Sequence, residues 1–153
     1  MAVRREVIQR LGPLDVRLLR GEDTELYGRC MAAGCRILYE PDAVAYHRIT
    51  GDKLTMDYAR RWHHWYGHYD AYLLPWKPLH LVTIMPLWRA ADTGRCIGRW
   101  ITVVLARRPW WERFRAELQV RQEASFWWHR LQLWPRWWLT VLTGRSRFER
   151  PAG

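Results

Sequence analysis

Hydrophobic positions before residue 50 recur at two different spacings, and together they predict a mixed α/β arrangement. Two stretches carry apolar residues at the three- and four-residue intervals of an amphipathic helix: residues 4–11 and 24–33. Two short apolar runs that follow have the composition of strands: residues 35–40 and 43–47. Pro41-Asp42 predicts a turn between these runs, and Gly34 suits the left-handed position just after a helix.

After residue 50 the spacing is almost entirely helical. The segments that predict helices are residues 53–74, 79–85, 87–106, 110–133 and 136–142. Pro86 and Pro135 separate neighbouring helices, and Pro109 suits the first turn of the helix after it. We therefore expect an α/β domain over residues 1–50, a helical extension over residues 51–144, and a frayed tail over residues 145–153.

Charge and tryptophan content change the picture of the helical part. The chain has 153 residues, 25 Lys+Arg against 15 Asp+Glu, a net charge of +10, and 12 Trp. Such a chain has two common partners, nucleic acid and an anionic membrane surface, and Trp and Tyr favour the bilayer interface. No nucleic-acid-binding signature accompanies the charge, so we rank nucleic acid last. The favoured partner of the helical part is a membrane surface, and the alternative is an ordinary core that uses tryptophan.

The expected compartment follows from the cysteines and from the apolar runs. The three cysteines are odd in number and match no metal-binding spacing, so we expect reduced thiols. No apolar run follows the first arginines, as it would in a signal peptide. Residues 79–105 are interrupted by Pro86 and four charged residues and do not predict a membrane span. We expect a cytoplasmic protein, peripheral on the inner face of the plasma membrane.

An acidic pair behind a glycine is the main candidate for chemistry, and several segments around it form a larger pattern. These segments are Met1-Ala2-Val3-Arg4-Arg5-Glu6-Val7, Gly12-Pro13-Leu14-Asp15, Gly21-Glu22-Asp23-Thr24-Glu25-Leu26, Gly34-Cys35-Arg36-Ile37-Leu38-Tyr39-Glu40-Pro41 and Tyr46-His47-Arg48. The pattern resembles the second half of family 2 glycosyltransferases of the GT-A type, and it is similar to the galactosyltransferase C-terminal region. The resemblance covers about the first third of the chain.

The resemblance implies a sugar transfer from a nucleotide-sugar donor to a glycan or lipid-linked acceptor, as in cell-envelope polysaccharide synthesis. It implies that Asp23 is the base that removes the acceptor hydroxyl proton and that Glu22 positions the acceptor. The alternative for Asp23 is a helix cap, since Asp is common at helix starts. The two roles are compatible with each other.

Further residues receive roles only through the same resemblance. It implies that His47 completes a site for a divalent metal, Mg²⁺ or Mn²⁺, that Arg48 meets the diphosphate, and that Arg61 and Trp62 lie near the acceptor or the leaving group. The alternatives are a polar strand end for His47, a solvated Arg48 and a packing role for Trp62. His63, His64 and His68 share helical spacing, and an interfacial cluster is favoured there over a metal site.

The family's donor-binding half is missing from the pattern, since no Asp-x-Asp occurs in the sequence. We therefore expect the acceptor-side part of a GT-A domain, dependent on a separate donor-binding half for activity. The competing hypothesis is a non-catalytic module that binds a membrane surface or a partner.

Overall fold

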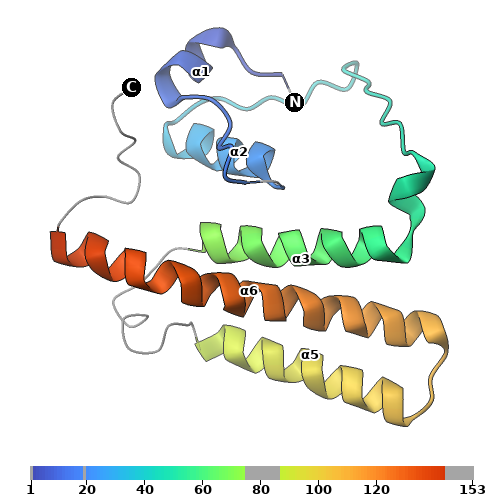
Figure 1. The fold of residues 1–153 in the computed structure, drawn as a ribbon. Coiled ribbons are helices and arrows are strands. Elements are labelled where there is room, and N and C mark those ends of the chain that lie inside the picture. Colours follow the sequence, from blue (N-terminus) through green and yellow to red (C-terminus); the bar gives the residue numbers. More distant parts are fainter. Residues whose placement is uncertain (1, 19, 75–86, 144–153) are drawn as a thin grey trace. The chain divides into compact units, whose positions relative to one another are not determined.

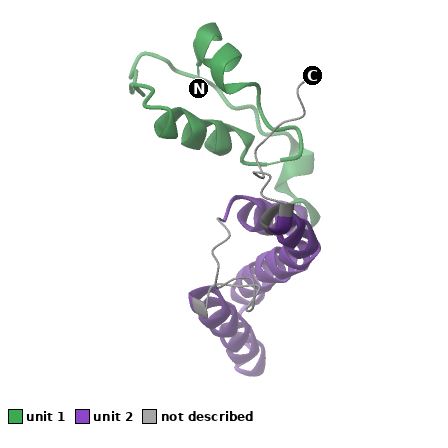
Figure 2. Ribbon diagram, turned by 90° about the vertical axis from the view of Figure 1, so that its left-hand side faces the viewer, with its two compact units in different colours: residues 1–58 green, residues 59–153 purple. Residues whose placement is uncertain are grey.

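A computed structural model describes residues 2–18, 20–74 and 87–143 of the chain. The chain forms two compact units, Met1–Tyr58 and Ala59–Gly153, which are described separately below (Figure 2). The helix predicted over residues 79–85 and the tail predicted over residues 145–153 lie outside the described residues.

The first unit contains two α-helices, α1 over Arg5–Leu11 and α2 over Glu22–Ala32 (Figure 1). Both predicted helices are confirmed, although α2 begins two residues before the predicted residue 24. The prediction for Gly34 is also confirmed: its φ is 69°, and the N–H of Cys35 bonds to the carbonyl of Cys30 at 2.9 Å. This hydrogen bond across the helix end is the Schellman type of termination, which favours glycine.

The α/β prediction is wrong, because the described residues contain helices and no strand. The two predicted strands, residues 35–40 and 43–47, are extended but pair with no other backbone segment in the described part of the chain. A strand depends on hydrogen bonds to a neighbouring strand, and an isolated two-stranded hairpin is only marginally stable in water. Apolar alternation alone therefore did not suffice to form a sheet.

The predicted turn between these runs is present. The N–H of Ala43 bonds to the carbonyl of Glu40 at 3.2 Å, across Pro41-Asp42. Around the turn, large apolar side chains are exposed: Ile37, Leu38, Tyr39, Val44, Tyr46 and Ile49. The buried apolar residues of the unit are few by comparison: Leu18, Leu26 and Cys30. The extended segment thus contributes little to the core of its own unit.

A 3₁₀-helix over Gly51–Leu54 leads into α3, which spans Met56–Leu73. The second unit continues with α5 over Leu87–Leu105 and α6 over Trp110–Thr143, and α6 lies between α3 and α5 (Figure 1). The predicted break at Pro135 is wrong, because α6 runs through it. Proline removes one backbone N–H donor, and at this exposed position water can satisfy the carbonyl that loses its partner.

Helices α3 and α6 approach most closely at Gly67, which is buried. A Cβ atom at this position would lie 2.2 Å from the carbonyl oxygen of Gln122 and 2.8 Å from the amide nitrogen of Phe126. The hydroxyl of Ser125 donates a hydrogen bond to the carbonyl of His64 at 2.6 Å, one turn away. The two helices therefore meet backbone to backbone, a distance that only glycine permits.

A charged network joins the three helices in the interior of the second unit. The guanidinium of Arg89 on α5 donates to the Oδ2 atom of Asp70 on α3 at 3.0 Å and contacts Oε1 of Glu123 on α6 at 2.8 Å. The hydroxyl of Thr93 donates to Oε2 of Glu123 at 2.7 Å and accepts the indole N–H of Trp127 at 2.9 Å. The buried carboxylate of Glu123 and the half-buried Arg89 and Asp70 are thus held by partners on neighbouring helices.

A buried arginine, Arg130, ties α6 to the C-terminal end of α3. The side chain of Arg130 is fully buried, and its Nη1 atom donates to the carbonyls of Ala71 and Leu74 at 3.1 and 2.8 Å. A cation is favoured at this end of a helix, where the last carbonyls lack helical partners. Arg89 and Arg130 therefore make their contacts in the interior of the unit.

We predict that Gly67→Ala destabilises the protein, because its methyl group would overlap backbone atoms that cannot move independently of α6. The expected loss is about 2 kcal/mol or more of unfolding free energy, measured by chemical denaturation. Gly98→Ala is the matched control, since a Cβ atom there meets nothing within 4 Å. That variant should gain about 0.5–1 kcal/mol, as a helical Gly→Ala change does. Equal stability changes in the two variants would contradict the close approach at Gly67.

Candidate functional site

The acidic pair lies in the first turn of α2. Gly21 precedes the helix with φ of 73°, a left-handed conformation that glycine adopts readily. Glu22 is half-buried and Asp23 is exposed. The Oδ1 atom of Asp23 accepts the backbone N–H of Thr24 at 2.7 Å and its hydroxyl at 3.3 Å. The N-cap residue is Gly21, so the Asp23 side chain lies inside the first turn and faces solvent.

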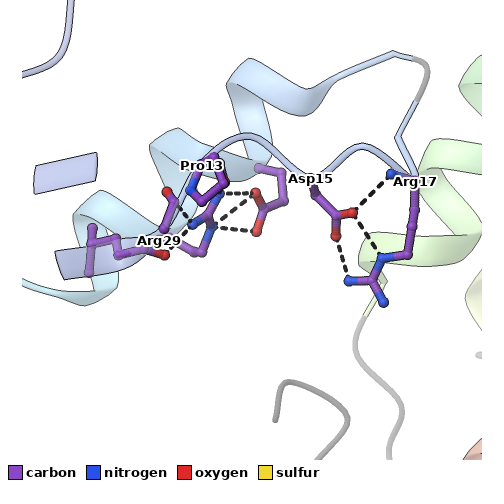
Figure 3. Close-up of polar contacts among 7 residues, drawn as sticks. Pro13, Asp15, Arg17 and Arg29 are labelled. Carbon is purple, nitrogen blue, oxygen red and sulfur yellow. Dashed lines mark hydrogen bonds and ion pairs between the residues drawn. The ribbon is translucent and has the colours of Figure 1, made fainter. Parts of the chain in front are cut away.

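Arg29 fixes α2 against the segment that follows α1 (Figure 3). Its Nη1 atom donates to the carbonyls of Leu11 at 2.6 Å and Gly12 at 3.2 Å, and Nη2 donates to the carbonyl of Pro13 at 2.9 Å. Its Nε atom donates to both carboxylate oxygens of Glu25, at 2.7 and 2.9 Å. One guanidinium therefore satisfies the carbonyls at the C-terminal end of α1 and holds them beside α2.

The sequence analysis did not identify the Arg29 contacts. The available signal was the spacing of Glu25 and Arg29, which are four residues apart on a predicted helix and can form an ion pair. The bonds from Arg29 to the carbonyls carry no sequence signature, since any residue supplies a carbonyl.

The loop before α2 contains a second local cluster. The Oδ1 atom of Asp15 accepts the N–H of Arg17 at 3.0 Å and its Nε atom at 2.8 Å (Figure 3). The carbonyl of Asp15 also accepts the N–H of Leu18 at 3.0 Å. Asp15 thus organises the turn between α1 and α2, a common use of aspartate in loops.

The other predicted site residues lie in two separate parts of the chain. His47 and Arg48 are exposed on the extended segment of the first unit. Arg61 is exposed on α3, and the half-buried ring of Trp62 lies 6.0 Å from the ring of Tyr66 on the same helix. Glu22 and Asp23 are adjacent on α2, and Arg61 and Trp62 are adjacent on α3, but no described contact joins the predicted residues of different segments.

Among the described residues there is no group of three or more His, Cys, Asp or Glu side chains suited to a metal ion. The described part of this chain therefore does not by itself fit the divalent metal that the resemblance implies for His47. Three histidines do cluster between α3 and α6: the ring of His129 lies 5.5 Å from that of His64 and 4.5 Å from that of His68. The adjacent His63 instead meets Oε1 of Gln122 at 3.1 Å.

Burial lowers the pKa of His64, and the neighbouring His129 and Arg121 lower it further. Burial likewise lowers the pKa of His68, with additional contributions from His129 and His64. These environments favour the neutral imidazoles in the folded protein.

Comparisons with protein families, with curated proteins and with solved structures found no match to this chain. In the described residues no helix is long and apolar enough to cross a membrane.

We predict that Arg29→Ala loosens the first unit, since it removes hydrogen bonds to three backbone carbonyls and to Glu25. Amide hydrogen exchange in α1 and α2 should accelerate about tenfold, which corresponds to a local loss of about 1.4 kcal/mol. Arg17→Ala is the matched control, because its contacts to Asp15 are local and partly exposed. Equal exchange in the two variants would show that Arg29 does not hold the helices together.

We also predict that acidification from about pH 7 to about pH 5 lowers the melting temperature of the protein. The lowered pKa values of His64 and His68 mean that the unfolded chain takes up protons first as the pH falls below the ordinary value of 6.5, so stability decreases through that window. His129→Gln should reduce this loss by removing a neighbouring imidazole.

The carboxyl of Glu117 titrates in a different window. Its hydrogen bond with Arg60 lowers its pKa below 4.5, so its contribution to stability is present above that value and is lost only in stronger acid.

A melting temperature that does not change between about pH 7 and about pH 5 would contradict the proposed role of the histidines.

Proposed function

We propose that residues 1–50 form the acceptor-side part of a family 2 glycosyltransferase that transfers a sugar from a nucleotide-sugar donor to a glycan or lipid-linked acceptor. The observation that carries the proposal is the acidic turn: an exposed Asp23 carboxylate in the first turn of α2, directly after the half-buried Glu22. The surrounding sequence segments that resemble the family support it. An exposed carboxylate on a fixed helix is accessible to an incoming hydroxyl group.

In this reaction the acceptor oxygen attacks the anomeric carbon while the bond from that carbon to the nucleoside diphosphate breaks. The acceptor hydroxyl is a weak acid, so a carboxylate that accepts its proton during the attack lowers the barrier. We assign this role to Asp23 and the positioning of the acceptor to Glu22. The Arg29 contacts hold α2 in place, as the geometry of a general base requires.

The remaining roles depend on a donor-binding half, which we propose as the partner of the first unit. The extended segment exposes apolar side chains and unpaired backbone, both of which a partner protein can cover. Arg48 would meet the diphosphate, and Arg61 and Trp62 would contact the acceptor. His47 has no further metal ligands grouped with it among the described residues, so no step is assigned to a metal.

A second candidate function is a non-catalytic membrane-surface or partner-binding module. The specific observation in its favour is the large number of exposed Trp and Arg side chains on α5 and α6. We propose that the protein lies in the cytoplasm, peripheral on the inner face of the plasma membrane.

We predict that Asp23→Asn lowers sugar transfer by at least about a hundredfold while donor binding survives, since the amide cannot accept the proton. The assay combines this chain with the donor-binding segment encoded nearest to it that carries Asp-x-Asp, in buffer with Mg²⁺ or Mn²⁺. Transfer is measured with radiolabelled nucleotide sugars, and donor binding is measured by equilibrium dialysis.

Asp52→Asn is the matched control, because Asp52 is exposed on the 3₁₀-helix outside the acidic turn and should leave transfer unchanged. Near-normal turnover of Asp23→Asn would exclude the base role. Absence of both binding and turnover in the wild-type pair would favour the non-catalytic module.

A further inference from the structure

Helix α5 has an apolar face that does not pack on α6. The residues that contact or face α6 include Arg89, Thr93 and the buried Val103. A different stripe carries exposed apolar side chains at the four- and three-residue spacing of one helix face: Ile97, Ile101 and Val104. Next to this stripe Leu105, at the end of the helix, is 76% exposed. An apolar stripe of α5 therefore remains in contact with solvent.

The apolar stripe continues to the turn between α5 and α6, where two aromatic side chains are exposed. Trp110 is 63% exposed and Trp111 is 49% exposed, at the first two positions of α6. Trp100 on α5 is exposed as well. Helices α5 and α6 form a hairpin (Figure 1), so these rings and the stripe belong to one end of it. We call this end the hairpin tip, defined as residues 97–115.

The hairpin tip is also basic. It carries five arginines against one glutamate, a net charge of +4: Arg99, Arg107, Arg108, Arg113 and Arg115 against Glu112. All five arginines are exposed, and none forms an ion pair with a described residue. The tip thus joins an uncovered apolar surface to uncompensated positive charge.

We propose that the hairpin tip docks on the surface of an anionic lipid bilayer. Exposed tryptophan beside arginine suits the interface, where the ring enters the headgroup boundary and the guanidinium meets lipid phosphate. The net charge of +4 favours an anionic surface. This inference does not depend on the proposed transferase activity.

The experiment is co-sedimentation of the full chain with vesicles of phosphatidylcholine and phosphatidylglycerol in equal parts, and with vesicles of phosphatidylcholine alone. We expect binding to the anionic vesicles that weakens as salt is added. Arg107→Gln together with Arg108→Gln should weaken binding about fivefold for each arginine. Trp110→Ser together with Trp111→Ser should weaken it about tenfold or more by removing interfacial apolar area.

Trp128→Ser is the matched control, because Trp128 is 60% exposed on α6 outside the hairpin tip. It should bind as the wild-type chain does. Circular dichroism establishes that each variant keeps its helices. If the tryptophan variant fails to fold, the arginine variant in the exposed turn tests the same surface.

Three results would overturn the proposal. One is equal binding to neutral and anionic vesicles. Another is wild-type binding by both the tryptophan and the arginine variants. The third is a chain that pellets or dimerises without vesicles through Trp110 and Trp111, which would make a second copy of the chain the occupant of the tip.

Discussion

The link from Arg89 to Asp70 and Glu123 determines the composition of the interior of the second unit. The half-buried guanidinium of Arg89 needs acceptors around it, and Asp70 on α3 and Glu123 on α6 supply carboxylates at the positions that face it. The guanidinium also lies 4.5 Å from the ring centroid of the buried Phe126, so charged and aromatic groups share this interior. Four apolar residues of α5 lie on its outer surface: Ile97, Ile101, Val104 and Leu105.

The close approach of the α3 and α6 backbones also limits the apolar volume in the interior of the second unit. At Gly67 a Cβ atom would meet the backbone of α6 and the small side chain of Ser125, so the two helices contribute little apolar volume there. The buried apolar set is accordingly small, with Ala71, Ala116 and Phe126 on these two helices. A unit with a polar interior and small contacts exposes large apolar side chains, and such surfaces mark interaction sites.

The first unit exposes apolar side chains for a different reason. Its buried apolar set is only Leu18, Leu26 and Cys30, and Arg29 holds the helices through backbone carbonyls as well. The extended segment that follows has the composition of strands but pairs with no backbone among the described residues, and its apolar side chains are exposed. What it lacks is the pairing that a sheet supplies, and pairing is a property of two segments rather than of one.

The sequence predicted the features that depend on local spacing. The helices of the first unit, the termination at Gly34 and the turn at Pro41-Asp42 each follow from a few neighbouring residues, and each is present. The strands were predicted from a local pattern but required a distant partner, so that prediction failed. Pro135 predicted a helix break because proline removes a backbone hydrogen bond, yet α6 continues through it.

The functional residues also divide into those that the local sequence predicts and those that depend on contact with another segment. The position of Glu22 and Asp23 at a helix start was accessible from sequence, since glycine and acidic residues mark such starts. The contacts of Arg29 and the approach at Gly67 were not, because both involve the backbone of another segment. Arginine content alone also could not separate Arg89 and Arg130, which are interior, from the arginines of the hairpin tip.

The two proposed surfaces together favour one kind of sugar acceptor. The acidic turn and the hairpin tip belong to different compact units, and each is stabilised by contacts within its own unit, so the two roles are physically separable. A chain held on a bilayer meets molecules in that bilayer at a much higher effective concentration than molecules in solution. Docking would therefore favour a lipid-linked acceptor over a free glycan.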